Sequence, residues 1–351
     1  MTTVYLIRHA EAEGNLYRRC HGHYDAVITA RGYRQIAALA KRFESEHIDA
    51  VYSSDLTRTM TTALAITRVH NLPLHTTPEL REVGVGTWED KTWTWLGKFD
   101  RERLLAFNTD AGNWHVEGGE DMPVLRARLL RALHAIIAAH PGGTVAVFSH
   151  GMALRLLIGT LQGLSVAEID KTRHAENTAV TKLTAGGDGI RVVYRDDDSH
   201  LSEELTTLHR QVWTKTKDGI EPGIWFRPDP RTQGRFEVMQ EDDIAGALSL
   251  HKDEEGVAVI DEFWLENAVQ GRGFGVRLIG QAVSYARAQG CERLDVVVPR
   301  GNALALKRAV EYGFSPERAT PKAVAYRLCI GRDEAYRTAR FDEAWDALRG
   351  T

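Results

Sequence analysis

Short apolar runs recur along the first two hundred residues, each followed at once by polar or charged side chains. The runs cover Val4–Ile7, Ile48–Tyr52 and Val145–Phe148. Runs of this length, rich in β-branched and aromatic residues, predict buried strands. Because they alternate with stretches of helical apolar spacing, they predict a three-layer, doubly wound α/β sheet. The predicted helices cover residues 29–43, 57–70, 123–140 and 152–161, and further strands cover 178–184 and 190–195.

The pattern changes after residue 200. A helix is predicted over 201–213, and residues 215–234 are rich in proline, glycine and charge, which predicts a connector. An antiparallel meander should follow over residues 236–266, before a helix, a strand, a second helix and a last strand over 323–328. The sequence therefore predicts three parts: a first domain over 1–205, a linker over 206–234, and a smaller α+β domain over 235–351.

Side chains suited to phosphate chemistry stand at or beyond the ends of the predicted strands. Because strand ends in a doubly wound sheet share one rim, these side chains are expected to converge. Arginine offers a planar fork of donors that matches phosphate, and histidine can act as a nucleophile or proton carrier near neutral pH. The set consists of Arg8, His9, Arg58, Glu82 and His150.

These residues lie in motifs that resemble the histidine phosphatase superfamily, which has the phosphoglycerate-mutase-like fold. RHAEAEGN over 8–15 matches the nucleophile motif, SSDLTRTMTTA over 53–63 the second arginine, and SHG over 149–151 the second histidine. Asn177 and His200 fit the closing segment. The resemblance covers residues 1–205.

The resemblance implies a role for each residue. His9 is the expected nucleophile, which passes through a phosphohistidine, and its proton should sit on the ring nitrogen facing a backbone acceptor. Arg8, Arg58 and the uncharged Asn15 are expected to bind phosphate. His150, protonated in the field of a phosphate dianion, should add a third positive donor. Glu82 is the expected general acid and base; it alone fits the family's Leu-x-Glu pattern, although Glu79 and Glu89 lie nearby.

The sequence departs from the family at Ala10 and Asp90, where glycine is common. Asp90 is expected to place a carboxylate near the lid and to disfavour very acidic substrates. The region 84–120, with four tryptophans, has two interpretations: a covering layer of buried aromatics, or a lid over the substrate. Its basic side chains are balanced by acidic ones, which favours a phosphomonoesterase over a mutase.

A glycine-rich turn before a predicted helix in the second half, Gln270-Gly271-Arg272-Gly273-Phe274-Gly275, offers backbone N–H groups that bind anions. With the Asn302-x-x-Ala305 motif it resembles the GNAT-type N-acetyltransferases over residues 218–335. A dinucleotide site competes, but the turn follows a meander rather than a βαβ unit. The resemblance implies acetyl-CoA on Leu265, Asn302 and this turn. Ala309 stands where the family usually has a tyrosine that acts as general acid, and Tyr312 lies three residues further on.

The composition of the chain limits the kinds of partner that it is expected to bind. The 351 residues carry a formal net charge of −4, which provides no general attraction to nucleic acid or anionic membranes. Three scattered cysteines and the lack of metal-binding spacings predict a reduced, cytoplasmic protein without a metal site. No leader and no membrane-spanning run is expected.

The sequence thus predicts a metal-independent phosphomonoesterase for a small phosphorylated metabolite, fused to a domain that binds acetyl-CoA and acetylates an amine. An alternative is an N-acetyltransferase whose phosphatase-like domain serves for binding or sensing. A third is a bifunctional enzyme that uses both reactions on one metabolite. The sequence is also consistent with a degenerate C-terminal domain that no longer catalyses a reaction and is retained for packing. The metabolite and the oligomeric state stay open.

Overall fold

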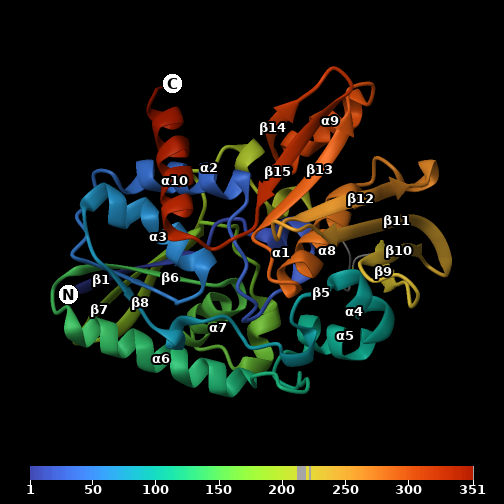
Figure 1. Ribbon diagram of the computed structural model, residues 1–351. Helices are drawn as coiled ribbons and strands as arrows, with labels where there is room; N and C mark the ends of the chain where they lie inside the picture. Colours follow the sequence, from blue (N-terminus) through green and yellow to red (C-terminus); the bar gives the residue numbers. More distant parts are fainter. Residues whose placement is uncertain (212–218, 221–222, 351) are drawn as a thin grey trace.

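The computed structural model describes residues 1–211, 219–220 and 223–350, which form two units with one large β-sheet each (Figure 1). The first sheet has the strand order β4-β3-β6-β1-β7-β8; its first four strands are parallel, and β7 and β8 are antiparallel. Its strands are β1 (Thr2–Arg8), β3 (Ala50–Ser53), β4 (Leu74–Thr76), β6 (Thr144–Ser149), β7 (Val180–Gly186) and β8 (Gly189–Asp197). A separate pair joins β2 (Arg19–Cys20) to β5 (Lys91–Thr92).

Both faces of the first sheet are covered, as the predicted three-layer arrangement requires. Along β1, Val4 and Leu6 belong to one hydrophobic cluster and Tyr5 and Ile7 to another, because successive side chains point to opposite faces. The cluster of Val4 includes side chains of α6 and α7, and the cluster of Tyr5 includes side chains of α2 and α3. Each pair of helices therefore covers one face of the sheet (Figure 1). The helices of this unit are α1 (Glu13–Tyr17), α2 (Ala30–Phe43), α3 (Thr57–His70), α4 (Trp93–Phe99), α5 (Arg101–Thr109), α6 (Met122–Ala139) and α7 (Gly151–Leu161).

The second sheet is antiparallel except for one pair, and its strand order is β14-β15-β13-β12-β11-β10-β9. The parallel strands β12 and β13 pair only over Ala258–Ile260 and Leu294–Val296, although both continue further. The helices α8 and α9 pack on this sheet. The elements are β9 (Ile224–Pro228), β10 (Arg235–Gln240), β11 (Asp243–Lys252), β12 (Ala258–Leu265), α8 (Phe274–Ala288), β13 (Arg293–Pro299), α9 (Ala303–Glu311), β14 (Ser315–Ala319) and β15 (Ala323–Cys329).

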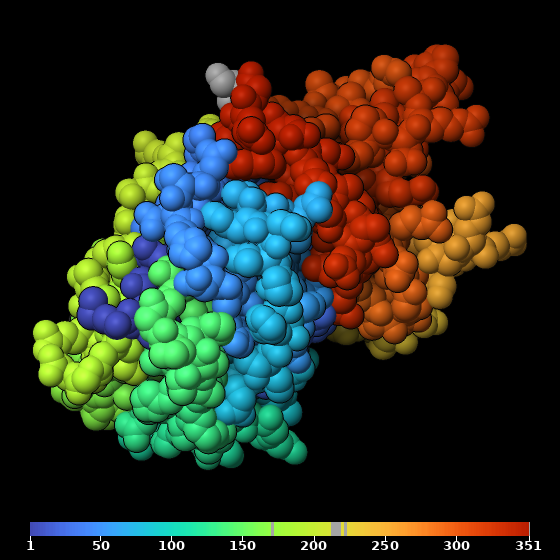
Figure 2. Space-filling model, turned by 90° about the vertical axis from the view of Figure 1, so that its left-hand side faces the viewer, coloured from blue at the N-terminus to red at the C-terminus, as the bar shows by residue number. Residues whose placement is uncertain are grey.

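The last helix, α10 (Glu334–Arg349), returns to the first unit and packs against α2 and α3. Its Phe341 is buried in the same cluster as Ile36 and Ile66. Figure 2 shows the red C-terminal segment lying directly against the blue segments of the first unit. The C-terminal part of the chain therefore completes a layer of the N-terminal fold.

Two segments differ from the prediction. Within the described part of the predicted helix over 201–213, the backbone forms only short 3-10 turns, Glu203–Leu205 and Leu208–Arg210. The cause is Glu176, whose buried carboxylate accepts hydrogen bonds from the backbone N–H groups of Thr207 and Leu208. These N–H groups are therefore not available for the backbone hydrogen bonds of a continuous helix. Residues 212 and 213 lie outside the described residues.

The connector predicted over 215–234 contains strand β9, which pairs with β10 and buries Ile224. Residues 215–218, 221 and 222 of that segment are not among those described. The proposed domain boundaries at residues 205 and 234 remain a prediction. Within the described residues, no helix is both long and apolar enough to cross a bilayer.

Candidate active site

A cavity of about 180 Å³ opens at the rim of the first sheet, where β1 ends. Arg8, His9, Arg58 and Glu82 line it, as the convergence of strand ends predicts, and Asn15 lines it too. His150 is completely buried behind this wall, with its ring centroid 5.3 Å from that of His9. Segments from four distant parts of the chain therefore meet around one space of the size of a small metabolite.

The ring of His9 is oriented by backbone. Its Nδ1 lies 2.7 Å from the carbonyl oxygen of Ala10, so Nδ1 carries the proton and Nε2 keeps its lone pair. The Nδ2 of Asn177 donates to the carbonyl of His9 at 2.8 Å and fixes the backbone beside it. Burial, with the charges of Arg58 and Arg8, holds the pKa of His9 well below 6.5. The protein thus keeps His9 neutral, as a nucleophile requires.

The two arginines are held rigidly. Arg58 donates from Nη1 to the carbonyl of Tyr24 and from Nη2 to that of Gly22, at 2.8 and 2.7 Å. Burial lowers its pKa to about 10, so it stays charged at neutral pH. Arg8 donates from Nη1 to the carbonyl of Ala175, while its buried Nε finds no partner among the described residues. An unpartnered guanidinium donor in a buried wall fits an anionic ligand.

His150 has a more specific environment than the sequence suggests. The Nε of Arg58 donates to its Nδ1 at 3.2 Å, so the proton must sit on Nε2, which donates to the hydroxyl of Ser54 at 2.9 Å. Burial, followed by the charge of Arg58, holds its pKa well below 6.5. The groups of the protein alone favour neutral His150. The positive charge expected on His150 depends on the field of a bound phosphate. The hydrogen bond from Arg58 to His150 forms without a ligand.

Glu82 lies over the N-terminus of α7. Its carboxylate accepts hydrogen bonds from the backbone N–H groups of Met152 and Ala153 at 3.0 and 2.9 Å. Of the three glutamates weighed in the sequence, Glu82 is the one that lines this cavity: Glu79 pairs with Arg131, and Glu89 accepts from the N–H of His23. The geometry supports the choice of Glu82.

The region 84–120 combines both of its interpretations. Trp88 and Trp114 are buried in the core, as expected of a covering layer. Trp93, Phe107 and Val85 line the cavity, as expected of a lid. The region 84–120 therefore contributes apolar and aromatic side chains to the lining of the cavity.

Asp90 does not act as expected. It does not line the cavity, because Arg19 donates from Nε to its carboxylate at 2.6 Å and Ser284 donates to it as well. It faces the second unit instead. Its carboxylate is paired there with the guanidinium of Arg19.

Sequence reasoning did not single out His21. The His21 side chain is only 9% exposed and lines the cavity, where its ring packs against that of Tyr24 at 5.0 Å. The available signal was its place in the chain, twelve residues after His9 and beside Gly22, whose carbonyl accepts from Arg58. Nothing in its local pattern marks a buried side chain.

The glycine-rich turn of the second unit leads into α8 as predicted. Gly271 and Gly273 have φ values of 73° and 77°, in the left-handed region that favours glycine, and a Cβ on either would meet no atom within 4 Å. Arg272 is exposed, and Phe274 is buried below it. Gln270 donates to the carbonyl of Leu265 at 2.7 Å, which ties the turn to the end of β12.

Asn302 has a structural contact: its Oδ1 accepts from the N–H of Ala305 and caps α9. Ala309 is buried, and the hydroxyl of Tyr312 lies 2.8 Å from the position that a Cβ would take on Gly275. The structure thus brings the turn, Leu265 and Tyr312 together around the start of α8.

Comparison with known families agrees with this geometry. Residues 4–198 match the model of the histidine phosphatase superfamily (branch 1). The chain belongs to this superfamily. Residues 199–314 match the acetyltransferase (GNAT) family, so the histidine phosphatase domain is fused to a GNAT domain.

Similar proteins cover the histidine phosphatase part. The probable phosphoglycerate mutase GpmB of Proteus mirabilis is 32% identical over 183 residues, which are 52% of this chain and 85% of that protein. YhfR of Bacillus stearothermophilus has a TM-score of 0.56 and 28% identity over 57% of this chain and 100% of its own. Phosphoserine phosphatase of Entamoeba histolytica, in complex with 3-phosphoglyceric acid, has a TM-score of 0.51 and 25% identity, with coverages of 57% and 100%. These relatives include both a probable mutase and a phosphatase.

Proposed function

We propose that the histidine phosphatase domain is a phosphomonoesterase that acts through a phosphohistidine without a metal ion. The observation that carries the proposal is the state of His9: its Nδ1–H donates to the carbonyl of Ala10, which leaves the Nε2 lone pair for nucleophilic attack in a cavity that Arg8 and Arg58 also line. The two guanidinium groups supply the positive charge that a transferring phosphoryl group needs on its equatorial oxygens.

The proposed reaction has two steps. The Nε2 of His9 attacks phosphorus, the P–O bond to the substrate breaks, and Glu82 gives a proton to the leaving alcohol. A water molecule then attacks the phosphohistidine while Glu82 takes its proton, and inorganic phosphate leaves with His9 restored. The hydrogen bonds from Met152 and Ala153 orient the Glu82 carboxyl for both transfers.

Hydrolysis is favoured over mutase activity by the composition of the cavity wall. A mutase must hold a second phosphate, which calls for a second set of basic groups. The other basic side chains that line the cavity are engaged or uncharged: Arg19 is bound to Asp90, Arg18 donates to Gln211, and burial lowers the pKa of His174 to about 3. The lining also includes Trp93, Phe107 and Val85. We therefore propose a small metabolite with a single phosphate and an apolar or aromatic alcohol part.

The GNAT domain is proposed to bind acetyl-CoA at the start of α8. The residues fit the group: the exposed left-handed glycines Gly271 and Gly273 present backbone N–H groups at a helix N-terminus, and β12 and β13 stop pairing beside it. Bound acetyl-CoA would supply a thioester-activated acetyl group. Tyr312 packs against the first turn of α8, and burial raises the pKa of its phenol, which keeps the phenol protonated.

The experiment that tests the phosphatase measures phosphate release from p-nitrophenyl phosphate and from alkyl phosphates. The His9→Ala variant should lose hydrolysis while staying folded. Glu82→Gln should lower turnover of alkyl esters by about 10²–10⁴-fold, whereas the initial burst of nitrophenolate from p-nitrophenyl phosphate should slow far less, because nitrophenolate leaves without a proton. Full activity of His9→Ala would disprove the proposal. Conversion of 3-phosphoglycerate to 2-phosphoglycerate without phosphate release would show a mutase instead.

The alternative is that acetyl transfer is the main activity. It is favoured by the intact glycine-rich turn and opposed by Ala309 at the position of the family's acidic tyrosine. Calorimetry with CoA and thiol release from acetyl-CoA with a panel of amines separate the two. Acetyl transfer in a chain that hydrolyses no phosphate ester would establish the alternative, and both activities on one metabolite would indicate the bifunctional enzyme.

A further inference from the structure

The short helix α1, which begins within the nucleophile motif, packs against the core of the GNAT domain. Tyr17 is only 3% exposed and belongs to the hydrophobic cluster of Leu278 and Val283 on α8. Gly280 permits this approach, because a Cβ there would lie 2.4 Å from the Cβ of Tyr17. The same helix carries Asn15, which lines the phosphate cavity. One turn of helix therefore contacts both the second core and the site of the first unit.

A buried ion pair joins α8 to α1. Arg287 donates from Nη1 and Nη2 to the two carboxylate oxygens of Glu13, at 2.5 and 2.8 Å. The two side chains are 9% and 6% exposed. Arg287 also donates to the carbonyl of Ile330 from Nε and Nη2, at 3.0 and 2.8 Å, so its guanidinium is fixed within its own domain. Because Arg287 is fixed in this way, its ion pair with Glu13 also fixes the position of α1.

Arg287 also reaches the loop that holds the phosphate-binding arginine. Its Nη1 lies 3.5 Å from the hydroxyl of Tyr24, and the backbone carbonyl of Tyr24 accepts from Arg58. A second arginine of the C-terminal half, Arg332, donates from Nε to the carbonyl of Asp25 at 2.7 Å. The Asp25 carboxylate accepts from the N–H of Thr57, at the start of the helix that carries Arg58.

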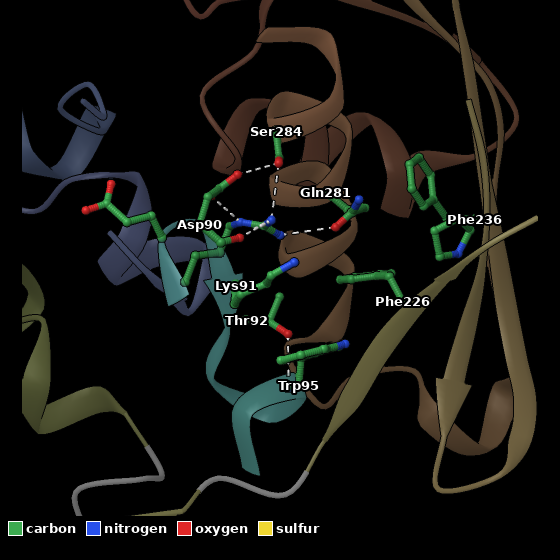
Figure 3. A pocket seen from close by; sticks show the side chains of 11 residues that line it. Asp90, Lys91, Thr92, Trp95, Phe226, Phe236, Gln281 and Ser284 are labelled. Atoms are coloured by element: carbon green, nitrogen blue, oxygen red, sulfur yellow. Dashed lines mark hydrogen bonds and ion pairs between the residues drawn. The ribbon is translucent and has the colours of Figure 1, made fainter. Parts of the chain in front are cut away.

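Separate contacts fix the middle of the same segment. Arg19 donates to Gln281 and Ser284 of α8, and Ser284 also donates to Asp90. Figure 3 shows Ser284 and Gln281 pointing from α8 toward Asp90, beside a cavity of about 310 Å³ between the units. The segment from Glu13 to Asp25 is thus held by α8 along most of its length.

We propose that Arg287 is a positioning residue of the phosphatase site, supplied by the GNAT domain. It holds α1 and the 21–25 loop, and through them Asn15 and Arg58, in the geometry that grips phosphate. The proposal rests on the proposed function of the first unit. The proposal offers a physical reason for the fusion of the two domains: α8, which follows the glycine-rich turn, also positions residues of the phosphate site.

Stability alone does not account for such a pair. Two charges removed from water gain little net stability over apolar side chains of similar volume, whereas a bidentate pair fixes distance and direction. A positional role therefore fits the chemistry of Arg287 and Glu13 better than simple packing. The difference is measurable, because a destabilised enzyme loses active molecules, whereas a misplaced Arg58 binds phosphate weakly.

The test compares variants of the full chain by two readouts. Arg287→Met removes the pair, Arg287→Lys keeps one charge contact, and Arg327→Met is the matched control, since Arg327 makes a bidentate pair with Asp295 inside the GNAT domain. The readouts are kcat and KM for p-nitrophenyl phosphate and the affinity for inorganic phosphate by calorimetry. Thermal unfolding verifies that each variant is folded.

Arg287→Met should raise KM and weaken phosphate binding by about 10- to 100-fold, as expected when binding groups shift by about 1 Å. Arg287→Lys should lie between this variant and the wild type, and Arg327→Met should match the wild type. Glu13→Gln should reproduce the effect, and the Glu13→Gln, Arg287→Met double variant should add little, because the two residues act as one unit.

Two outcomes overturn the proposal: a folded Arg287→Met variant with wild-type KM and phosphate affinity, or one whose kcat alone falls in proportion to unfolded protein. The proposed function fails in a different way. If the wild type turns over no phosphate ester, calorimetry with inorganic phosphate still decides whether Arg287 positions the site.

Discussion

Three histidines around the phosphate cavity are kept neutral by their surroundings. Burial, followed by the charge of Arg58, holds the pKa of His9, His21 and His150 well below 6.5. Burial and the charge of Arg58, which is proposed to bind phosphate, thus act together to keep His9 unprotonated.

This arrangement predicts a dependence of stability on pH. Because these histidines bind fewer protons in the folded than in the unfolded chain, their stabilisation is complete above about pH 6.5 and is lost as the pH falls below it. Each contributes a loss of at most about 1.4 kcal/mol per pH unit. Urea unfolding between pH 7.5 and 5 measures it: His150→Gln should show a shallower loss than wild type. The exposed-site variant His47→Gln should not, and identical slopes for His150→Gln and wild type would contradict the assignment.

At the scale of elements, α10 belongs in space to the first unit although it ends the chain. Phe341 is only 1% exposed between α2 and α3, and Arg337 donates to the hydroxyl of Thr61 on α3 at 3.1 Å. Arg68 of α3 pairs with Asp342 at the surface. The helix therefore covers an apolar face that the first two hundred residues leave open.

Phe341→Ala is expected to lower the free energy of unfolding by about 3–5 kcal/mol, because it removes a large side chain from a closed core. Leu348→Ala, on the same helix but 40% exposed, is the control and should change it by less than about 1 kcal/mol. Urea unfolding followed by circular dichroism measures both. Equal, small effects would mean that α10 does not contribute to the core of the first unit.

At the scale of the molecule, two sheets with separate cores meet where α1 contacts α8 and where α4 contacts β9. Between α1 and α8, a close approach of Tyr17 to Gly280 is combined with charged contacts at either side of it. Glycine is unfavourable inside a helix, so its place in α8 reflects this approach. A domain kept merely for packing would fit these contacts, but the glycine-rich turn at the start of the same helix favours a bound cofactor as well.

Gly280→Ala is therefore expected to push α1 away from α8. The clash with Tyr17 should cost about 1–3 kcal/mol of stability and raise KM for phosphate esters, since Asn15 moves with α1. Gly301→Ala is the matched control, because a Cβ there meets nothing within 4 Å. Steady-state kinetics and thermal unfolding test both variants, and a Gly280→Ala enzyme with unchanged KM would argue against coupling through α1.

Local pattern was enough for much of this protein. Apolar runs and helical spacing identify the sheet of the first unit, and Thr29 caps α2 as its position suggests, accepting from the N–H of Gly32 at 3.1 Å. The strand-end rule brings Arg8, His9, Arg58 and Glu82 to one cavity. These features depend on the period of the backbone and on the chemistry of single residues, both of which are written in the sequence.

Tertiary structure decided the rest. His21 is buried beside Gly14, Tyr24 and the distant Asp90, and Tyr17 belongs to the second core because Gly280 leaves room for it. Residues 207–208 do not continue a helix because Glu176 accepts hydrogen bonds from their N–H groups. Each depends on a contact between residues far apart in the chain. Burial and hydrogen bonding are set by which faces meet, and no window of sequence contains both partners.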